Sequence, residues 1–253
     1  MNNRVTLADL LAAKREGHKF AAISCYDYGT ARLVSQADIP MVLVGDSAAQ
    51  LVLGFDSTLP AKMDFMVAIT AAVRRGAPNA FLVADMPFLS CPVGISEAVS
   101  DTGIAVMAHI GIRPQSISKI GRYKAEATAA EMVVGVISLA EQMVETGANM
   151  LLVEGTAAEV TEIITSRSEV PVVGIGAGPH CDGQILVAPD VLGLLQGPSP
   201  KFSKSYDNLA ERSIKAFTTY SAEVKNAQYP DPAHSYHMKP GESERLRTLL
   251  EKP

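Results

Sequence analysis

Five side chains in this sequence combine chemical function with a shared position, at or just past the end of a short apolar run. They are Asp46, Ser47, Asp85, His109 and Glu154. The carboxyl ends of parallel strands form the binding face of α/β proteins, so these groups are expected to meet on one rim. One aspartate after a strand is often only a turn former or helix N-cap, and one histidine is often a core residue. Acids that recur at several strand ends favour a functional site.

The types of these residues point to metal chemistry. Asp46 and Asp85 are two carboxylates without clustered His or Cys, a set that suits Mg²⁺ better than Zn²⁺. A 2-oxo acid could chelate such a metal through its carboxylate and keto oxygens, and the metal would stabilise an enolate. Glu154 could then remove the proton next to the carbonyl. The residues predict metal-assisted enolate chemistry on a small oxo acid.

Two other strand ends are polar or rich in glycine. Tyr26 and Asp27 follow the first apolar run, and residues 174–178 read Gly-Ile-Gly-Ala-Gly. The glycine stretch is either a strand-to-helix turn or a backbone surface for an anion. It lacks the G-x-G-x-x-G spacing of dinucleotide-binding loops, so a nicotinamide cofactor is not expected.

The elements that must position these groups alternate along the chain. Apolar runs of the kind buried on both faces of a parallel sheet occupy residues 20–26, 41–45, 80–84, 104–108, 150–153, 170–175 and 184–187. Helix-like segments lie at residues 30–37, 63–75, 128–146, 157–166 and 208–225, and Thr156 is the expected N-cap of the fourth. This alternation predicts an α/β fold with right-handed crossovers. Seven strands are one fewer than a closed (β/α)₈ barrel uses.

Composition excludes several classes of protein. The chain has 253 residues, 47% of them hydrophobic, and is expected to form a single domain over residues 1–253, with a charged C-terminal tail at 238–253. A net charge of −5 argues against a nucleic-acid surface. No apolar stretch suits a membrane span, and the N-terminus lacks a signal-peptide core. Three widely spaced cysteines, Cys25, Cys91 and Cys181, predict a reduced, cytoplasmic chain.

A series of short motifs, in order along roughly residues 5–237, carries a resemblance to a known family. They include Val-Leu-Val-Gly-Asp-Ser at 42–47, Ala-Asp-Met-Pro-Phe at 84–88 and His-Ile-Gly-Ile-Arg-Pro-Gln-Ser at 109–116. Further motifs lie at residues 26–28, 54–60, 72–78, 121–124, 152–154, 174–178, 182–187, 200–202 and 234–236. With them the chain resembles the ketopantoate hydroxymethyltransferase (3-methyl-2-oxobutanoate hydroxymethyltransferase) family.

The resemblance implies a TIM-type (β/α)₈ barrel and a Mg²⁺-dependent transferase of pantothenate biosynthesis. Such an enzyme moves a hydroxymethyl group from 5,10-methylenetetrahydrofolate to 3-methyl-2-oxobutanoate, giving 2-dehydropantoate. By position, Asp46 and Asp85 look like the metal ligands and Ser47 like a contact to the oxo-acid carboxylate. His109 looks like a substrate-site residue and Glu154 like the base for the C3 proton. The family also implies a homo-oligomer, a decamer if this chain follows its relatives.

The chain departs from the family after Phe88. There the family continues with a helix and a strand ending in a Lys-Leu-Glu-Gly-Gly-like motif, whereas here the next family strand begins by Ile104. The difference is about one strand-helix step, close to the ~30 residues of a βαβ unit. The lysine and glutamate of that motif have no equivalent by position. Residues 91–95 are a candidate replacement strand, with Glu97 a candidate substitute acid. Smaller departures lie at residues 48–50 and 125–127.

A lost strand leaves a barrel with two unpaired edges. The neighbouring strands could close over the gap, residues 91–97 could pair there, or a partner subunit could cover it. Two alternatives to an active transferase therefore stay open: a degenerate, non-catalytic paralogue, and a Mg²⁺-dependent C–C lyase or aldolase acting on another small 2-oxo acid.

Overall fold

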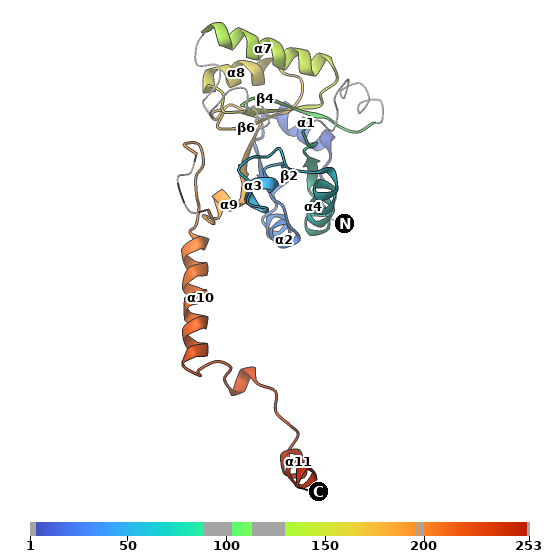
Figure 1. The fold of residues 1–253 in the computed structure, drawn as a ribbon. Coiled ribbons are helices and arrows are strands. Elements are labelled where there is room, and N and C mark those ends of the chain that lie inside the picture. The colour runs from blue at the N-terminus through green and yellow to red at the C-terminus, as the bar shows by residue number, and fades with distance from the viewer. Residues whose placement is uncertain (1–3, 89–102, 113–129, 196, 198–199, 252–253) are drawn as a thin grey trace. The chain divides into compact units, whose positions relative to one another are not determined.

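A computed structural model describes residues 4–88, 103–112, 130–195, 197 and 200–251 (Figure 1). The chain divides into two compact units, Met1–Tyr206 and Asp207–Pro253, which are described separately. The sequence predictions for residues 91–97, 121–124 and 125–127 lie outside the described residues.

The first unit contains one parallel sheet of seven strands, hydrogen-bonded in the order β3-β2-β1-β7-β6-β5-β4. Every pairing is parallel. The strands are β1 (Phe20–Ser24), β2 (Met41–Val44), β3 (Phe81–Ala84), β4 (Met107–Gly111), β5 (Met150–Glu154), β6 (Val172–Ile175) and β7 (Gly183–Val187). The first strand pairs with both the second and the last, so the sheet curls as a barrel does. This confirms the predicted α/β fold and the count of seven strands in the described residues.

The helices of this unit are α1 (Leu7–Arg15), α2 (Tyr28–Gln36), α3 (Ala48–Leu51), α4 (Met63–Gly76), α7 (Ala130–Glu145), α8 (Ala158–Arg167) and α9 (Ala188–Val191). Helices α2, α4, α7 and α8 cover the outer face of the curled sheet, whereas Leu10 of α1 packs in the cluster on its inner face. Alternate residues of a strand face opposite sides of a sheet. Val42 and Val44 of β2 accordingly pack in a cluster with α2 and α4, while Met41 and Leu43 belong to a cluster on the inner face. Burial on both faces explains the continuous apolar runs in the sequence.

Within the described residues, β3 and β4 are the two edges of the sheet, which is open between them. These edge strands are mostly half-buried, whereas β2 is fully buried. The opening lies between the residues that flank the strand-helix step expected to be missing, and the described parts of β3 and β4 do not pair with each other.

Two local predictions need correction. The fourth strand runs over Met107–Gly111 rather than residues 104–108, because Asn149 caps its start: Asn149 Oδ1 accepts from the Val106 amide at 2.9 Å. Thr156 is not the N-cap of α8; Ala157 holds that position without a side-chain cap, and the Thr156 hydroxyl donates to the Glu154 carbonyl instead.

Helix α1 lies in a segment for which no element was predicted. The Thr6 hydroxyl accepts from the Asp9 amide and the Asp9 carboxylate accepts from the Thr6 amide, which together form a capping box at its start. Only Leu10 of this helix is buried, so the apolar periodicity that reveals a helix in a sequence is weak here.

The second unit consists of α10 (Leu209–Lys225), the short 3₁₀ helix η2 (Pro232–His234) and α11 (Glu242–Leu250). Asn208 caps α10 by accepting from the Glu211 amide, and none of the residues in these three elements is buried. Across the residues that the structure describes, no helix has both the length and the apolarity needed to cross a bilayer.

Candidate active site

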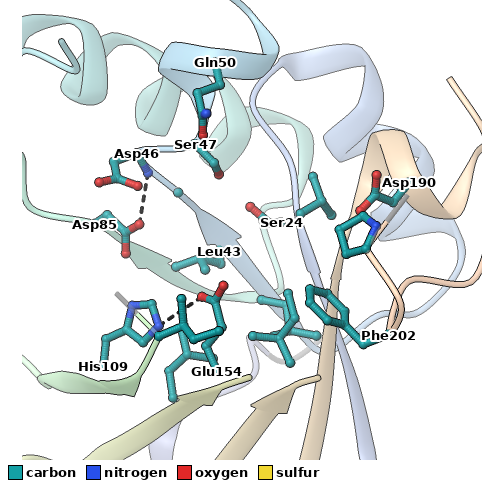
Figure 2. Close-up of a pocket in the computed structure, with 17 residues that line it drawn as sticks. Ser24, Leu43, Asp46, Ser47, Gln50, Asp85, His109, Glu154, Asp190 and Phe202 are labelled. Carbon is teal, nitrogen blue, oxygen red and sulfur yellow. Dashed lines mark hydrogen bonds and ion pairs between the residues drawn. The ribbon is translucent and has the colours of Figure 1, made fainter. Parts of the chain in front are cut away.

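A cavity of about 500 Å³ lies at the carboxyl ends of the strands (Figure 2). All five side chains singled out in the sequence line it, namely Asp46, Ser47, Asp85, His109 and Glu154. Their elements explain the convergence, because inward-facing positions alternate along each strand. On β4 and β5, for example, Met107 and Met150 face inward, so His109 and Glu154 do too.

The two aspartates lie side by side on one wall. The Asp46 amide donates to Asp85 Oδ2 at 2.9 Å. The pKa of Asp85 is raised to about 6, mainly by burial and to a lesser extent by the nearby Asp46 and Glu154 carboxylates, while the Asp46 amide and His109 oppose the rise. A side chain at Gly45 would come within 2.9 Å of the Ser47 hydroxyl and 3.5 Å of Asp85 Oδ2, so glycine leaves this wall open.

A histidine and a glutamate form a second pair on the neighbouring wall. His109 Nε2 lies 3.1 Å from Glu154 Oε2, although the ring nitrogen has no well-aligned hydrogen bond among the described residues. The Glu154 carbonyl accepts from the Ile112 amide at 2.9 Å. Gly111 approaches that carbonyl at φ 86°, and a Cβ there would overlap it. The backbone that carries the glutamate is therefore held by a contact that only glycine permits.

The hydroxyls of Ser24, Tyr26 and Ser47 are linked in a row. The Ser47 hydroxyl lies 2.8 Å from the Tyr26 hydroxyl, to which Ser24 Oγ donates at 3.3 Å. Burial raises the pKa of Tyr26 to about 12, so the phenol keeps its proton at neutral pH. It can therefore donate to Ser47 and fix its orientation. Asp27, by contrast, is a helix N-cap that accepts from the Thr30 amide, as the structural interpretation of strand-end acids allowed.

The remaining wall is mostly apolar and holds one carboxylate that the sequence analysis did not single out. Phe202 packs on Gly176, where any Cβ would meet the ring at 2.5 Å. Asp190, in α9, is the additional acid. It follows the last apolar run by three residues, so the strand-end pattern could have found it. Gln50 and Ser24 also line the cavity. The other apolar lining residues are Leu43, Ile112, Leu152, Ile175, Ile185, Val187 and Pro200.

Asp46 and Asp85 are a donor set that fits Mg²⁺. Among the described side chains, no group of three or more His, Cys, Asp or Glu residues is placed to share a metal ion. Mg²⁺ does not need one, because it usually takes one or two protein carboxylates and fills its other positions with water and substrate oxygens. The raised pKa of Asp85 results mainly from burial, and the neighbouring Asp46 carboxylate adds to it, so a bound cation would relieve both effects.

Comparison with known proteins decides the family. The sequence model of ketopantoate hydroxymethyltransferase matches residues 4–102 and 93–232. The 3-methyl-2-oxobutanoate hydroxymethyltransferase of Geobacter metallireducens is 37% identical over 266 residues, 93% of this chain and 100% of the relative. The chain belongs to the ketopantoate hydroxymethyltransferase family. This confirms the family predicted from the sequence motifs.

The comparisons also locate the difference from other members of the ketopantoate hydroxymethyltransferase family. The relative from Syntrophobacter fumaroxidans is 37% identical, and the alignment covers 100% of both chains. This alignment is 282 residues long, whereas the present chain has 253 residues, so the relative contains residues that have no counterpart here. The two segments of the family match meet at residues 93–102. That junction falls where the sequence analysis located the lost strand-helix step.

Solved structures with a related fold are distant in sequence. A phosphonopyruvate hydrolase in complex with oxalate and Mg²⁺ aligns with a TM-score of 0.52 at 14% identity, over 96% of this chain and 97% of the other. An oxaloacetate acetylhydrolase in complex with 3,3-difluorooxalacetate gives 0.53 at 11% identity, over 97% and 95%. At these identities the likeness shows a shared barrel-like fold and nothing more.

Proposed function

We propose that this protein transfers a hydroxymethyl group from 5,10-methylenetetrahydrofolate to 3-methyl-2-oxobutanoate, giving 2-dehydropantoate. The observation that carries the proposal is the presence of the Asp46–Asp85 pair and the Glu154 carboxylate in one cavity. Membership of the ketopantoate hydroxymethyltransferase family supports it.

The first half of the proposed reaction is proton removal. Mg²⁺ held by Asp46 and Asp85 would withdraw electron density from the keto oxygen and so acidify the proton at C3. Glu154 takes that proton as the general base. His109 Nε2 lies 3.1 Å from the Glu154 carboxylate, which places the imidazole ring beside the base. The Ser47 hydroxyl, fixed by Tyr26, donates to the carboxylate of the oxo acid.

The second half forms a carbon–carbon bond. The nucleophilic C3 attacks the methylene carbon of the folate, the carbon–nitrogen bonds to that carbon are broken, and water supplies the hydroxyl oxygen. Tetrahydrofolate leaves with its nitrogens protonated. The apolar wall around Leu43, Ile185 and Val187 suits the branched alkyl group of the oxo acid and keeps bulk water from it.

The open sheet bears on the state of assembly. The edge strands β3 and β4 carry unpaired backbone groups in the described residues. Asp85 directly follows β3, and His109 lies within β4. Unpaired edges are usually covered. We therefore include in the proposal a cytoplasmic homo-oligomer, a decamer if it follows its family, in which a neighbouring subunit shields this opening.

Hydrogen exchange tests the first half of the reaction alone. The protein is incubated with 3-methyl-2-oxobutanoate and Mg²⁺ in deuterium oxide, and loss of the C3 proton signal is followed by NMR. We expect exchange well above the buffer rate that stops when EDTA is added. Exchange no faster than buffer, with a protein that is folded by circular dichroism, would contradict the proposal.

Two other functions compete with this one. The open sheet beside Asp85 and His109 favours a non-catalytic paralogue, which predicts no Mg²⁺-dependent binding of the oxo acid by calorimetry and co-purification with a complete relative. A C–C lyase would use the same carboxylates on an enolate made by bond cleavage. Release of pyruvate from candidate 2-oxo or 2-hydroxy acids, without any folate, separates lyase from transferase.

A further inference from the structure

Asp190 is a buried acid that the proposed proton removal does not use. It lines the cavity and is only 8% exposed. Its main-chain carbonyl accepts from the Ser205 hydroxyl at 2.8 Å, but the structure gives its carboxylate no hydrogen bond or ion pair with a described residue. The carboxylate oxygens are open to the cavity instead. The side chain is therefore suited to a ligand that brings hydrogen-bond donors.

The position of Asp190 separates it from the metal-binding wall. Figure 2 shows it on the side of the cavity away from Asp46 and Asp85, with Ser24 and Leu43 between them. It does not form a group of three metal-binding side chains with those two acids in the described part of the chain. The oxo acid offers only negative charge and acceptor oxygens, which a second carboxylate repels. Neither Mg²⁺ nor the oxo acid accounts for Asp190.

The remaining reactant has the complementary chemistry. The pterin ring of a reduced folate carries a ring N–H beside an exocyclic amino group, a pair of donors that a carboxylate can accept in a two-point contact. A second cavity of about 1070 Å³ shares Ile112, Pro200 and Phe202 with the first, which leaves adjoining room for a ligand longer than the oxo acid.

We propose that Asp190 binds the 2-amino-pyrimidine edge of the pterin of the one-carbon donor, which places the donor against the apolar wall opposite the metal. This inference rests on the proposed function. A purely structural role for Asp190, as an acid in the first turn of the short helix α9, predicts instead that Asp190→Asn leaves the preference for a ligand with the 2-amino group unchanged.

The test measures binding of tetrahydrofolate, the product, to the Mg²⁺-loaded full-length protein by anaerobic calorimetry. Asp190→Asn replaces one acceptor oxygen with a donor of the same shape, so tetrahydrofolate binding should weaken by about tenfold or more. The charge-matched control is Asp38→Asn, on the exposed surface at φ 53°, where asparagine is well tolerated.

A ligand series makes the test independent of the variant's folding. The unmodified protein should bind a tetrahydrofolate analogue without the 2-amino group about tenfold more weakly than tetrahydrofolate, and in Asp190→Asn this difference should largely vanish. Equal binding of both ligands by the unmodified protein, or tetrahydrofolate binding by Asp190→Asn as tight as by the unmodified protein, would overturn the inference. If the unmodified protein binds tetrahydrofolate and exchanges the C3 proton in those cases, the proposed function survives and only the role of Asp190 fails. If it binds no tetrahydrofolate at all, the folate half of the proposed function fails as well.

Discussion

At the scale of single residues, the site is a set of acids kept close together by glycine and backbone contacts. Gly45 leaves room beside Ser47 and Asp85, and Gly111 allows the backbone to approach Glu154. This arrangement disfavours the ionised form of Asp85, whose pKa is raised to about 6 mainly by burial. The arrangement favours a bound cation over the stability of the metal-free protein.

Replacing this acid should therefore stabilise the metal-free protein. The ordinary pKa of Asp85 is 3.8, so the native state binds its proton more tightly than the unfolded chain and is penalised once the group ionises. With EDTA, Asp85→Asn should raise the free energy of unfolding by on the order of 1–2 kcal/mol above pH 6, a value discounted for partial exposure. The gain should fade as the pH falls from about 6 towards 4, where the native carboxyl takes up its proton.

Urea denaturation of the two proteins at pH 7.5 and pH 4.5 measures this difference. The same variant should lose Mg²⁺-dependent exchange of the C3 proton. A loss of stability at pH 7.5 would show that Asp85 is not under electrostatic strain in the folded protein.

At the scale of elements, parallel strands bring distant side chains together, and this is why much of the site was predictable. Continuous apolar runs located all seven strands, and inward-facing positions at their ends supplied the five site residues. The predictions that failed concern features that depend on tertiary contacts. The start of β4 depends on Asn149, and α1 buries only Leu10.

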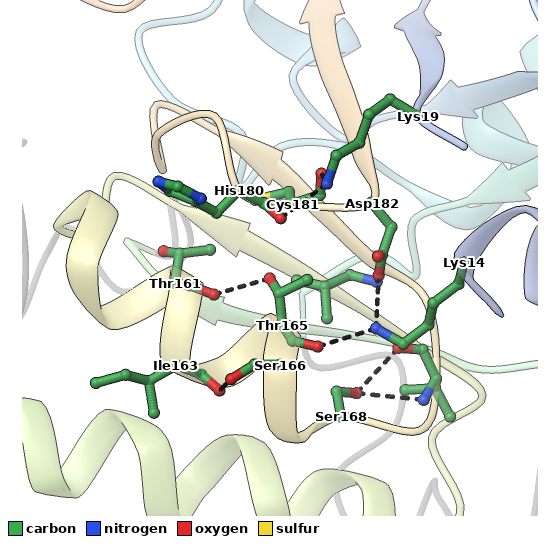
Figure 3. Close-up of polar contacts among 12 residues, drawn as sticks. Lys14, Lys19, Thr161, Ile163, Thr165, Ser166, Ser168, His180, Cys181 and Asp182 are labelled. Atoms are coloured by element: carbon green, nitrogen blue, oxygen red, sulfur yellow. Dashed lines mark hydrogen bonds and ion pairs between the residues drawn. The ribbon is translucent and has the colours of Figure 1, made fainter. Parts of the chain in front are cut away.

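One ion pair joins the missed helix α1 to the sheet (Figure 3). Lys14 Nζ donates to Asp182 Oδ2 at 2.9 Å and to the Thr165 carbonyl at 3.0 Å. The same Asp182 oxygen accepts from the Val172 amide at 2.8 Å. Both side chains are largely buried, at 13% and 9% exposure, so removal of one leaves the other without its charge partner.

We expect Asp182→Ala to lower the free energy of unfolding by about 3 kcal/mol, because it leaves the buried Lys14 ammonium and the Val172 amide without their shared acceptor. The control is Glu141→Ala, which removes an exposed partner of Arg167 at 3.3 Å and should cost less than about 0.5 kcal/mol. Chemical denaturation compares the two variants. Equal losses would mean that the buried pair contributes no more than a surface pair.

At the scale of the whole molecule, the open sheet and the second unit both suggest association. Helix α10 carries an apolar row at three- and four-residue spacing, and each of its members is exposed: Ile214, Phe217, Tyr220 and Val224. An exposed apolar face of this kind usually marks an interaction surface. A homo-oligomer would cover it.

Sedimentation velocity tests that expectation. The unmodified chain should sediment as an assembly, and Phe217→Asp should shift it towards smaller species. Thr219→Asp adds the same charge to the opposite side of the helix and should leave the assembly intact. A monomer at micromolar concentration, or equal effects of the two variants, would exclude α10 as a contact between subunits.

The proposed mechanism depends most on Glu154, which would remove the C3 proton of an oxo acid bound at the Asp46–Asp85 pair. The most direct test compares C3 exchange in deuterium oxide between the unmodified protein and Glu154→Gln, both with Mg²⁺. We predict that exchange falls by roughly 10²–10⁴-fold, the usual contribution of a general base, while calorimetric affinity for 3-methyl-2-oxobutanoate changes little. Unchanged exchange in Glu154→Gln would contradict the account.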